Sequence, residues 1–239
     1  MGLFDKKFCS ICGEKIGLFG NRKLEDGNLC KNCAAKLSPW FSDRRSSTVE
    51  QIRQQLEYRE ANKAKVAEFH VTRTLGKRTK VLFDEDAKKF MVTSASNLQN
   101  ANPDVLDFAD VTGCSSRVNE TKTEIKKELP DGKEESYVPK RYKYDYDFYV
   151  TINVNNPYFN EMEFQINDDL VEEKDSIEFR NYQMMCEEIK FVLLQVRQQI
   201  RDSIEAQNAP KKQVKCPYCG ATTTPTANGT CEFCGGALD

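Results

Sequence analysis

The chain has 239 residues, and its 35 basic and 37 acidic side chains give a formal net charge of −2 at neutral pH. This balance provides no overall positive field, so it argues against holding nucleic acid by general neutralisation of phosphates. The longest purely apolar run, residues 191–194, is too short to span a bilayer, and the N-terminus opens no apolar export segment. We therefore expect a cytoplasmic protein without a transmembrane segment.

Eight of the ten cysteines fall into four Cys-x-x-Cys pairs, two near each end of the chain. Two thiolates three positions apart can reach one metal ion from a tight turn, and two such turns complete a tetrahedral zinc shell. Because four sulfurs leave no position for water, such sites are structural rather than catalytic. The spacing therefore predicts two structural Zn²⁺ ions per chain. Their ligands would be Cys9, Cys12, Cys30 and Cys33 at the first site, and Cys216, Cys219, Cys231 and Cys234 at the second.

Three other interpretations of these cysteines are weaker. Disulfides require an oxidising compartment, for which the N-terminus gives no sign. A thioredoxin-like redox pair needs one Cys-x-x-Cys at the start of a helix within a βαβ unit, not two pairs that close on each other. Iron can replace zinc in a four-cysteine site, but this is the minority use of the spacing. Zinc remains the favoured ion.

The first cluster predicts a treble-clef-like zinc finger over residues 1–42. The segment between Cys12 and Cys30 contains the turn Glu25–Gly27 and indicates a short hairpin. The second pair opens a short helix that ends before Pro39. DNA-binding fingers of the GATA type share this spacing, but here acidic residues offset the basic ones and no basic tail follows. A DNA-reading role is therefore not favoured.

The sequence of this finger resembles a known family. Residues 9–24, 26–33 and 37–41 are similar to the start of an uncharacterised, bacterial and mostly Firmicute family that is described only as a domain of unknown function. The resemblance extends from the N-terminus to about His70. It implies that the zinc module precedes a helix and a β-rich domain, and it implies no activity.

A linking helix is predicted over residues 43–68. Ser47 and Glu50 have the spacing of a capping box, and the helical pattern continues to about Phe69. Its apolar stripe is sparse, so we expect the helix to pack along one narrow seam between modules. A helix that forms a dimer is the alternative. The stripe consists of Val49, Ile52, Leu56 and Val66.

The middle of the chain, residues 69–206, changes to an alternating pattern. Residues 142–154 alternate apolar and polar side chains, which predicts a strand with one face on a core. Residues 79–83 and 89–93 predict two more strands, and Pro130–Gly132 marks the turn of a long hairpin. Met162, Phe164 and Ile166 continue the alternation. We expect six or seven antiparallel strands in this region.

Helical spacing returns at about residues 176–205, where Asp175 and Glu178 could cap the start. The apolar positions of this helix are Tyr182, Met185, Ile189, Leu193, Val196, Ile200 and Ile204. A meander of strands closed by one C-terminal helix resembles a pleckstrin-homology-like barrel. The predicted fold class is therefore α+β, with a barrel of this kind between two zinc modules.

In lipid-binding barrels of that type, basic residues near the first hairpin hold anionic headgroups. Arg73, Lys77, Arg78 and Lys80 lie near the first strand turn here and are candidate anion or lipid contacts. Four basic residues in a chain with this many are more commonly a solvated edge, and the neighbouring acidic residues 84–86 weaken an anion site. Lipid binding by the barrel is thus a minor hypothesis.

Catalytic motifs are lacking. The single histidine, His70, has no nucleophile that the sequence pairs with it, and it is interpreted as a packing or surface residue. Cys114 and Cys186 stand outside the four pairs and are expected to be small buried residues. No phosphate-binding glycine loop occurs. The sequence therefore predicts that the protein is not an enzyme.

The C-terminal region is predicted to be a polar tether, residues 207–215, followed by a short zinc ribbon, residues 216–239. Residues 220–230 separate the two cysteine pairs of the ribbon. A ribbon of about two dozen residues cannot bury a core, so the metal must supply the folding free energy. Tyr218 and Phe233 are expected either to form an exposed aromatic patch or to shield the sulfurs.

Together these features predict a non-enzymatic zinc-binding adaptor or scaffold that binds a protein partner. A nucleic-acid-binding or regulatory zinc-finger protein is the alternative, and binding of an anionic lipid surface by the barrel ranks third.

Overall fold

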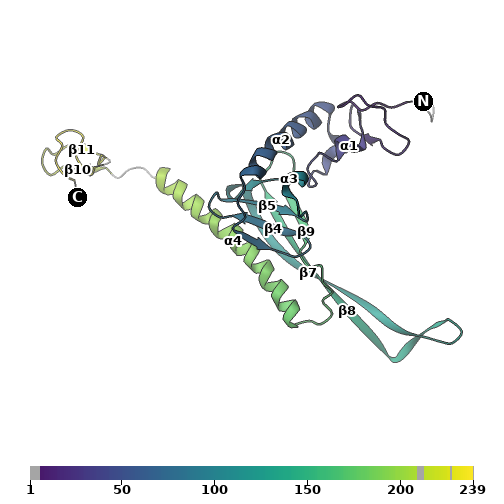
Figure 1. Ribbon diagram of the computed structural model, residues 1–239. Helices are drawn as coiled ribbons and strands as arrows, with labels where there is room; N and C mark the ends of the chain where they lie inside the picture. The colour runs from purple at the N-terminus through teal and green to yellow at the C-terminus, as the bar shows by residue number, and fades with distance from the viewer. Residues whose placement is uncertain (1–5, 209–212, 227, 239) are drawn as a thin grey trace. The chain divides into compact units, whose positions relative to one another are not determined.

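The computed structural model describes residues 6–208, 213–226 and 228–238. The chain divides into two compact units, Met1–Arg197 and Gln198–Asp239, and the boundary lies within the long helix α4, Ile177–Asn208 (Figure 1). Part of the predicted tether, residues 209–212, lies outside the described residues.

The N-terminal finger has the predicted order of knuckle, hairpin and helix. Strands β1, Arg22–Lys23, and β2, Asn28–Leu29, form an antiparallel pair, and α1, Lys31–Ala34, follows at once. A 3-10 turn, η1, spans Asp43–Ser46. The finger also has an apolar core around the cysteines, which accounts for its compactness. The buried aliphatic residues of this core are Ile16, Leu24, Leu29, Leu37 and Ile52.

Helix α2, Val49–Glu68, begins one residue later than the predicted capping box requires. The hydroxyl of Thr48 accepts from the Gln51 amide, and the Gln51 side chain accepts from the Thr48 amide. Ser47 lies one residue before this N-cap, and its hydroxyl donates to the carbonyl of Asp43 at 2.8 Å. The prediction of Ser47 and Glu50 as the capping box was therefore wrong by one position.

The buried face of α2 is more polar than the predicted apolar seam. Ile52 and Val66 are buried as expected, but Gln55, Arg59 and Asn62 lie buried on the same face between them. A helical residue of these types is normally exposed unless it is paired. The partners of Arg59 and Asn62 come from the finger and from the loop before β6.

An ion pair between Arg59 and Asp104 lies at the centre of this polar face. The Arg59 Nη1 to Asp104 Oδ1 distance is 2.7 Å, and the two side chains are 7% and 0% exposed. The other carboxylate oxygen accepts from the Ser38 hydroxyl at 2.8 Å, and Arg59 also donates to the carbonyls of Lys36 and Asn102. Finger, helix and loop therefore share one buried network.

Asn62 and Asn102 extend the network. The Asn62 side chain donates to Asn102 Oδ1 at 2.8 Å and to the Pro103 carbonyl at 2.7 Å, and it accepts from the Val105 amide at 3.0 Å. Asn102 adopts a left-handed conformation with φ of 48° and donates to the Arg59 carbonyl. Asparagine tolerates this conformation better than most residues. The loop is thus shaped to meet the helix.

The middle region contains seven strands in two antiparallel sheets. The first sheet has the order β3, Arg73–Leu75; β4, Lys80–Asp84; β5, Lys89–Thr93; and β6, Leu106–Asp107. The second has the order β7, Val111–Glu128; β8, Glu134–Val154; and β9, Glu161–Gln165. Two short helical segments, α3, Leu98–Ala101, and η2, Phe108–Asp110, flank β6.

The predicted number of strands is confirmed, but a barrel is not. Neither sheet closes on itself, since β3 and β6 are edges of the first sheet and β7 and β9 are edges of the second. Alternation along a strand identifies its buried face, but closure depends on pairing between distant strands. The pleckstrin-homology-like barrel is therefore not confirmed by the structure.

The first sheet is buried on both faces. Leu82 and Met91 pack with Val66 of α2 on one face. Phe83 and Phe90, at alternate positions, lie on the other face with Phe108, at ring centroid distances of 6.1 and 6.0 Å. Helix α2 thus packs on the first sheet, and its Arg59 also binds Asp104 in the loop before β6.

Helix α4 covers the second sheet with its first turns. The Phe148 ring lies 5.1 Å from Phe179 and 5.5 Å from Tyr182. The helix is capped by the Ser176 hydroxyl, which accepts from the Phe179 amide at 3.1 Å, so the predicted cap at Asp175 was off by one position. The side chains of Val196, Ile200 and Ile204 lie outside the described part of the helix. No described helix is long and apolar enough to cross a membrane.

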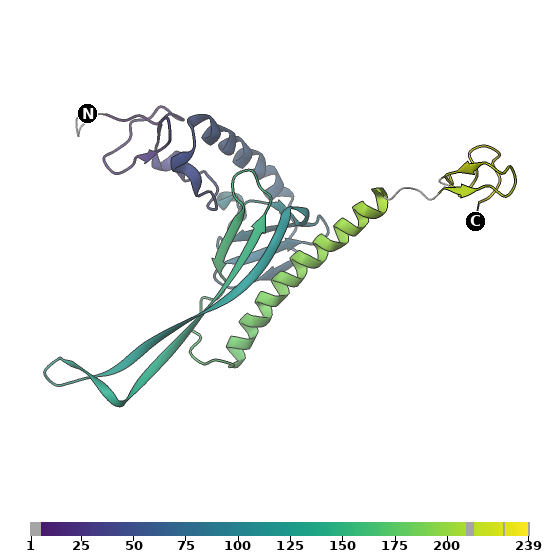
Figure 2. The same cartoon turned by 180° about the vertical axis from the view of Figure 1, so that it is seen from behind.

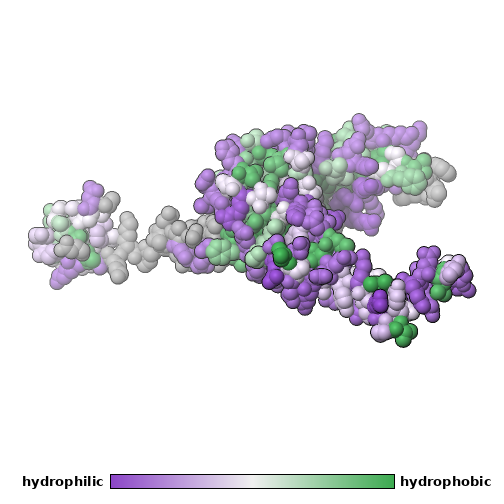
Figure 3. Space-filling model, turned by 60° about the horizontal axis from the view of Figure 1, so that its bottom comes forward, coloured by the Kyte–Doolittle hydropathy of each residue, from purple (hydrophilic) through white to green (hydrophobic). Residues whose placement is uncertain are grey.

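Strands β7 and β8 continue far beyond the part of the second sheet that contains β9, and there they form a two-stranded arm (Figures 1 and 2). Strand β9 pairs only with residues 149–153 of β8, so the rest of the arm has no third strand. The arm surface is largely hydrophilic with separate hydrophobic spots (Figure 3). Val138, in β8, is 98% exposed. Cross-strand ion pairs stabilise it: Lys126 with Glu134, Lys127 with Glu135 and Lys140 with Glu124.

The buried ion pair generates the first prediction. We expect Arg59→Met to lower the free energy of unfolding by about 3–5 kcal/mol, because Asp104 would remain buried without a counter-charge. Chemical denaturation of the zinc-loaded protein measures this change. Arg59→Met combined with Asp104→Leu should recover part of the loss, since no charge is then stranded.

The matched control is Lys63→Met, which breaks the exposed pair between Lys63 and Glu60 on the same helix. That variant should change stability by no more than about 0.5 kcal/mol. A loss for Arg59→Met no larger than the loss for this control would contradict the central role of the network.

Candidate metal centres

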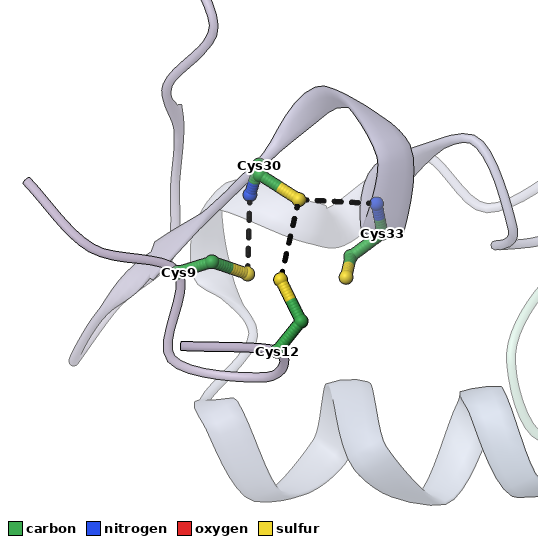
Figure 4. A group of neighbouring side chains, drawn as sticks. All are labelled: Cys9, Cys12, Cys30 and Cys33. Atoms are coloured by element: carbon green, nitrogen blue, oxygen red, sulfur yellow. Dashed lines mark hydrogen bonds between the residues drawn. The ribbon is translucent and has the colours of Figure 1, made fainter. Parts of the chain in front are cut away.

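The first cysteine cluster is held by the finger's loop and by the start of α1 (Figure 4). All four sulfurs of Cys9, Cys12, Cys30 and Cys33 lie within 4.8 Å of one another, and Cys12 Sγ is 3.7 Å from Cys30 Sγ. Cys30 is the N-cap of α1, and its sulfur accepts from the Cys33 amide at 3.3 Å. The Cys30 amide donates to Cys9 Sγ at 3.4 Å. The backbone therefore orients the sulfurs toward a common point.

The second cluster repeats this arrangement in the C-terminal unit. The sulfurs of Cys216, Cys219, Cys231 and Cys234 also lie within 4.8 Å of one another. Cys216 Sγ is 3.6 Å from Cys234 Sγ, and Cys219 Sγ is 3.7 Å from Cys231 Sγ. A two-stranded pair, β10, Val214–Lys215, with β11, Thr222–Thr223, supports the first knuckle.

These separations fit a metal shell and not a disulfide. Sulfurs at about 2.3 Å from a central ion in a tetrahedron are about 3.8 Å apart. A disulfide would place them at about 2.05 Å. All ten cysteines are free thiols in the structure. Both predicted four-cysteine sets are thus brought together with a geometry suited to one metal ion each.

Three of the four knuckles turn at a glycine. Gly13, Gly220 and Gly235 have φ values of 75°, 75° and 73°, in the left-handed region that favours glycine. Each glycine amide donates to the carbonyl of the first cysteine of its pair, at 2.8–2.9 Å. The fourth pair, Cys30 and Cys33, needs no such glycine because a helix begins there.

Hydrogen bonds and burial shift the pKa values of the thiols within each cluster in opposite directions. Burial raises the pKa of Cys9, but the backbone amides of Cys12 and Cys30 outweigh it and bring that pKa to about 6. The amide of Cys219 is the main cause of a pKa of about 6 at Cys216. Burial and the neighbouring sulfurs raise the pKa of Cys33. One thiolate forms readily in each cluster, and a bound cation would stabilise the others.

The two centres differ in what surrounds them. Three cysteines of the first, Cys9, Cys30 and Cys33, lie in an apolar core that includes Ile52 of α2. In the described part of the C-terminal ribbon, only Cys216, Thr223 and Cys231 are buried. Tyr218 and Phe233 are 71% and 67% exposed, so they form a surface feature rather than a cover over the sulfurs. The ribbon therefore has no core apart from its metal site.

The four predicted anion contacts have different surroundings. Arg73 pairs with Glu85 and Glu188 at 3.0 and 3.1 Å, and Lys77 pairs with Asp169. Arg78 is within 3.5 Å of the Gln165 side chain. Lys80 forms no ion pair with any residue that the structure describes. Acidic side chains thus already occupy the positions beside two of these four residues.

His70, Cys114 and Cys186 lie outside both cysteine clusters. His70 is exposed, and its backbone amide donates to Asp84. Cys186 is buried and Cys114 is half-buried, and burial raises the pKa of each thiol to about 12. Both remain protonated at neutral pH, which makes them poor nucleophiles.

The sequence interpretation missed a group of cations beside the first centre. Arg44 and Arg45, together with Arg22 and Lys23, line a hollow of about 830 Å³ next to the β1–β2 hairpin. The only signal in the sequence was the adjacent pair of arginines after Asp43. In the sequence, Arg22 and Lys23 precede the second knuckle and α1, and Arg44 and Arg45 follow them. Only the fold brings these two pairs together.

Residues 7–55 match a protein family described as Domain of unknown function (DUF4428). The match covers the finger and the start of α2, in agreement with the resemblance inferred for this part of the chain. No curated protein and no solved structure matches the chain. The comparisons therefore support the identity of the N-terminal module and assign no activity to it.

The geometry predicts two metal ions per chain. Cys33→Ser and Cys234→Ser should each reduce the content to one ion, because each removes one thiolate from a different cluster. Cys114→Ser is the control and should retain both. Elemental analysis of reduced protein measures the content, and one ion or none in the unmodified chain would contradict the assignment.

The difference in surroundings predicts a difference in stability. Cys231→Ser with Cys234→Ser should unfold the ribbon while the melt of Met1–Arg197 changes by no more than about 0.5 kcal/mol. Amide dispersion in NMR spectra reports on the ribbon, and thermal denaturation reports on the larger unit. Loss of the cooperative melt in this variant would show that the two units depend on each other.

Proposed function

We propose that both cysteine clusters hold structural Zn²⁺ and that the protein is a non-enzymatic adaptor that binds other proteins. The observation that carries this proposal is the pair of four-thiolate sets with sulfur separations of 3.6–3.7 Å. Four thiolates in a tetrahedron suit zinc and leave no open coordination position for a substrate. The metal then stabilises a surface rather than performing a reaction.

A hydrophobic face of α4 supports the protein-binding role. Ile177, Met184 and Phe191 recur every seven residues on this helix and are 68%, 62% and 61% exposed. Residues at this spacing lie along one line of a helix. This line is separate from the buried residues of α4 that contact the second sheet. Exposed apolar side chains in a row mark an interaction surface more often than isolated ones do.

Two hollows border this α4 face. One of about 630 Å³ is lined by Phe191 and Leu194 with charged residues of the same helix. The other, of about 370 Å³, is lined by Leu75, Met184 and Met185 among others. Apolar hollows with polar rims accept the side chains of a bound peptide. The α4 face is therefore the surface that we assign to a protein partner.

A nucleic-acid-binding role is the second candidate. Residues 6–48 contain nine basic and four acidic side chains, and this surplus favours the role because phosphate contacts require clustered cations. The acidic residues elsewhere in the chain and the apolar α4 face favour a protein instead.

The α4 face generates a prediction. Met184→Asp with Phe191→Asp should reduce capture of a specific cellular partner by at least roughly tenfold, since apolar contacts at an interface centre carry most of the binding energy. Quantitative mass spectrometry of proteins bound to the tagged chain in native cells measures the loss.

Val118→Asp with Val138→Asp, at exposed apolar positions on the arm, is the matched control and should retain the partner. Both variants should keep two zinc ions and an unchanged melt. Equal capture by all variants, or a partner set that nuclease treatment removes, would replace the protein-binding proposal by the second candidate.

A further inference from the structure

The loop between the first knuckle and β1 presents two apolar side chains directly to solvent. Leu18 and Phe19 are 90% and 91% exposed, which is close to complete exposure. The Gly20 amide donates to the Gly17 carbonyl at 3.0 Å, so the two residues lie at the apex of a tight turn. Elsewhere in the finger, leucines such as Leu24 and Leu29 are fully buried. The exposure of Leu18 and Phe19 thus differs from that of these leucines, and packing in the core of the finger does not explain it.

Basic side chains surround the base of this turn. The Arg22 guanidinium donates to the Phe19 carbonyl at 3.2 Å, which places a cation directly beside the apex. Arg44 donates to the Lys23 carbonyl at 2.7 Å, so η1 adds its cations to the same side of the hairpin. Arg45 lines the hollow described above as well, together with Asn21, Leu24 and Glu25. We call Arg22, Lys23, Arg44 and Arg45 the basic collar.

Among the described residues the basic collar is not ion-paired, although Glu25 lines the same hollow. None of its four residues forms an ion pair with a described acidic residue, whereas the basic residues of the arm and of the first sheet are largely paired. Burial lowers the pKa of Arg44, and the charges of Arg45 and Arg22 lower it further. Such mutual repulsion is relieved when an external anion binds.

The net charge of the finger as a whole also favours an anionic partner. Residues 6–48 contain nine basic and four acidic side chains, although the full chain has a net charge of −2. The surplus remains positive even after the two negative charges of a zinc tetrathiolate are counted. Positive potential is therefore concentrated on this one module.

We propose that the finger docks on an anionic phospholipid surface, with Leu18 and Phe19 inserted among the acyl chains and the basic collar at the headgroups. An apolar tip with cations behind it matches the two layers of a bilayer interface, hydrocarbon below and phosphate above. A nucleic acid would use the cations and stack on Phe19, but it offers no apolar layer for Leu18. The apolar apex therefore decides between the two anionic partners.

This site differs from the lipid contacts considered at Arg73, Lys77, Arg78 and Lys80. Arg73 and Lys77 of that group pair with Glu85, Glu188 and Asp169, whereas no residue of the basic collar forms an ion pair with a described residue. Each free cation near an anionic leaflet strengthens membrane partitioning by roughly fivefold. The finger alone thus has both the charge and the apolar surface for peripheral binding.

Co-sedimentation with vesicles tests the proposal on the full, zinc-loaded chain. Vesicles of equal parts phosphatidylglycerol and phosphatidylcholine should bind the protein, and vesicles of phosphatidylcholine alone should not. Arg44→Glu with Arg45→Glu should weaken binding by at least roughly tenfold. Leu18→Ser with Phe19→Ser should weaken it by a similar factor, because insertion contributes apolar burial. Charge reversal at Arg73, Lys77, Arg78 and Lys80 is the control and should leave binding unchanged.

A gain of signal complements these losses. Phe19→Trp should show a blue-shifted and enhanced emission with phosphatidylglycerol vesicles, because the indole would enter the acyl region. Three outcomes would overturn the proposal: no binding to anionic vesicles, loss only on charge reversal at the Arg73 group, or an unshifted emission of the introduced indole with tight binding of duplex DNA. The metal content of each variant should remain two ions per chain.

Discussion

The Arg59–Asp104 ion pair is the interaction on which the larger unit depends. Removing two charges from water is costly, and only close geometry with further hydrogen bonds offsets that cost. Here the carboxylate binds both Arg59 and Ser38, and the guanidinium reaches two carbonyls as well. Because these groups come from the finger, α2 and the loop before β6, they can all be satisfied in only one arrangement of the three.

That arrangement changes how the finger is understood. A zinc finger joined by a linking helix could turn freely, yet this finger shares its buried polar network and part of its apolar core with α2. Trp40 extends the contact to Phe164 of β9 at a ring centroid distance of 6.2 Å, and Tyr58 meets Tyr158 at 5.1 Å. The N-terminal centre therefore stabilises an interface within the unit, whereas the C-terminal centre stabilises little beyond its own knuckles.

The parts of this structure that follow from short-range rules could be predicted from the sequence. Four Cys-x-x-Cys pairs identified both candidate metal centres, and alternation identified most of β8. The runs 79–83 and 89–93 on either side of an acidic turn identified β4 and β5. Caps at Thr48 and Ser176 were missed by one residue, because adjacent hydroxyl and carboxyl residues compete for the same role. The sequence pattern could not predict that both sheets stay open or that α2 has a buried polar face. Periodicity counts apolar residues only, and the partner of Arg59 lies 45 positions away along the chain.

The β7–β8 arm has a consequence for the behaviour of this protein in solution. A ribbon without a third strand exposes unpaired backbone groups along both edges, which is a template for pairing with the edge of another molecule. Charged side chains recur along both strands, and Val138 and Pro139 interrupt the register near the bulge after Ile125. Such edges disfavour the addition of a strand. The arm can therefore remain extended at high protein concentration without becoming a site of fibrous association.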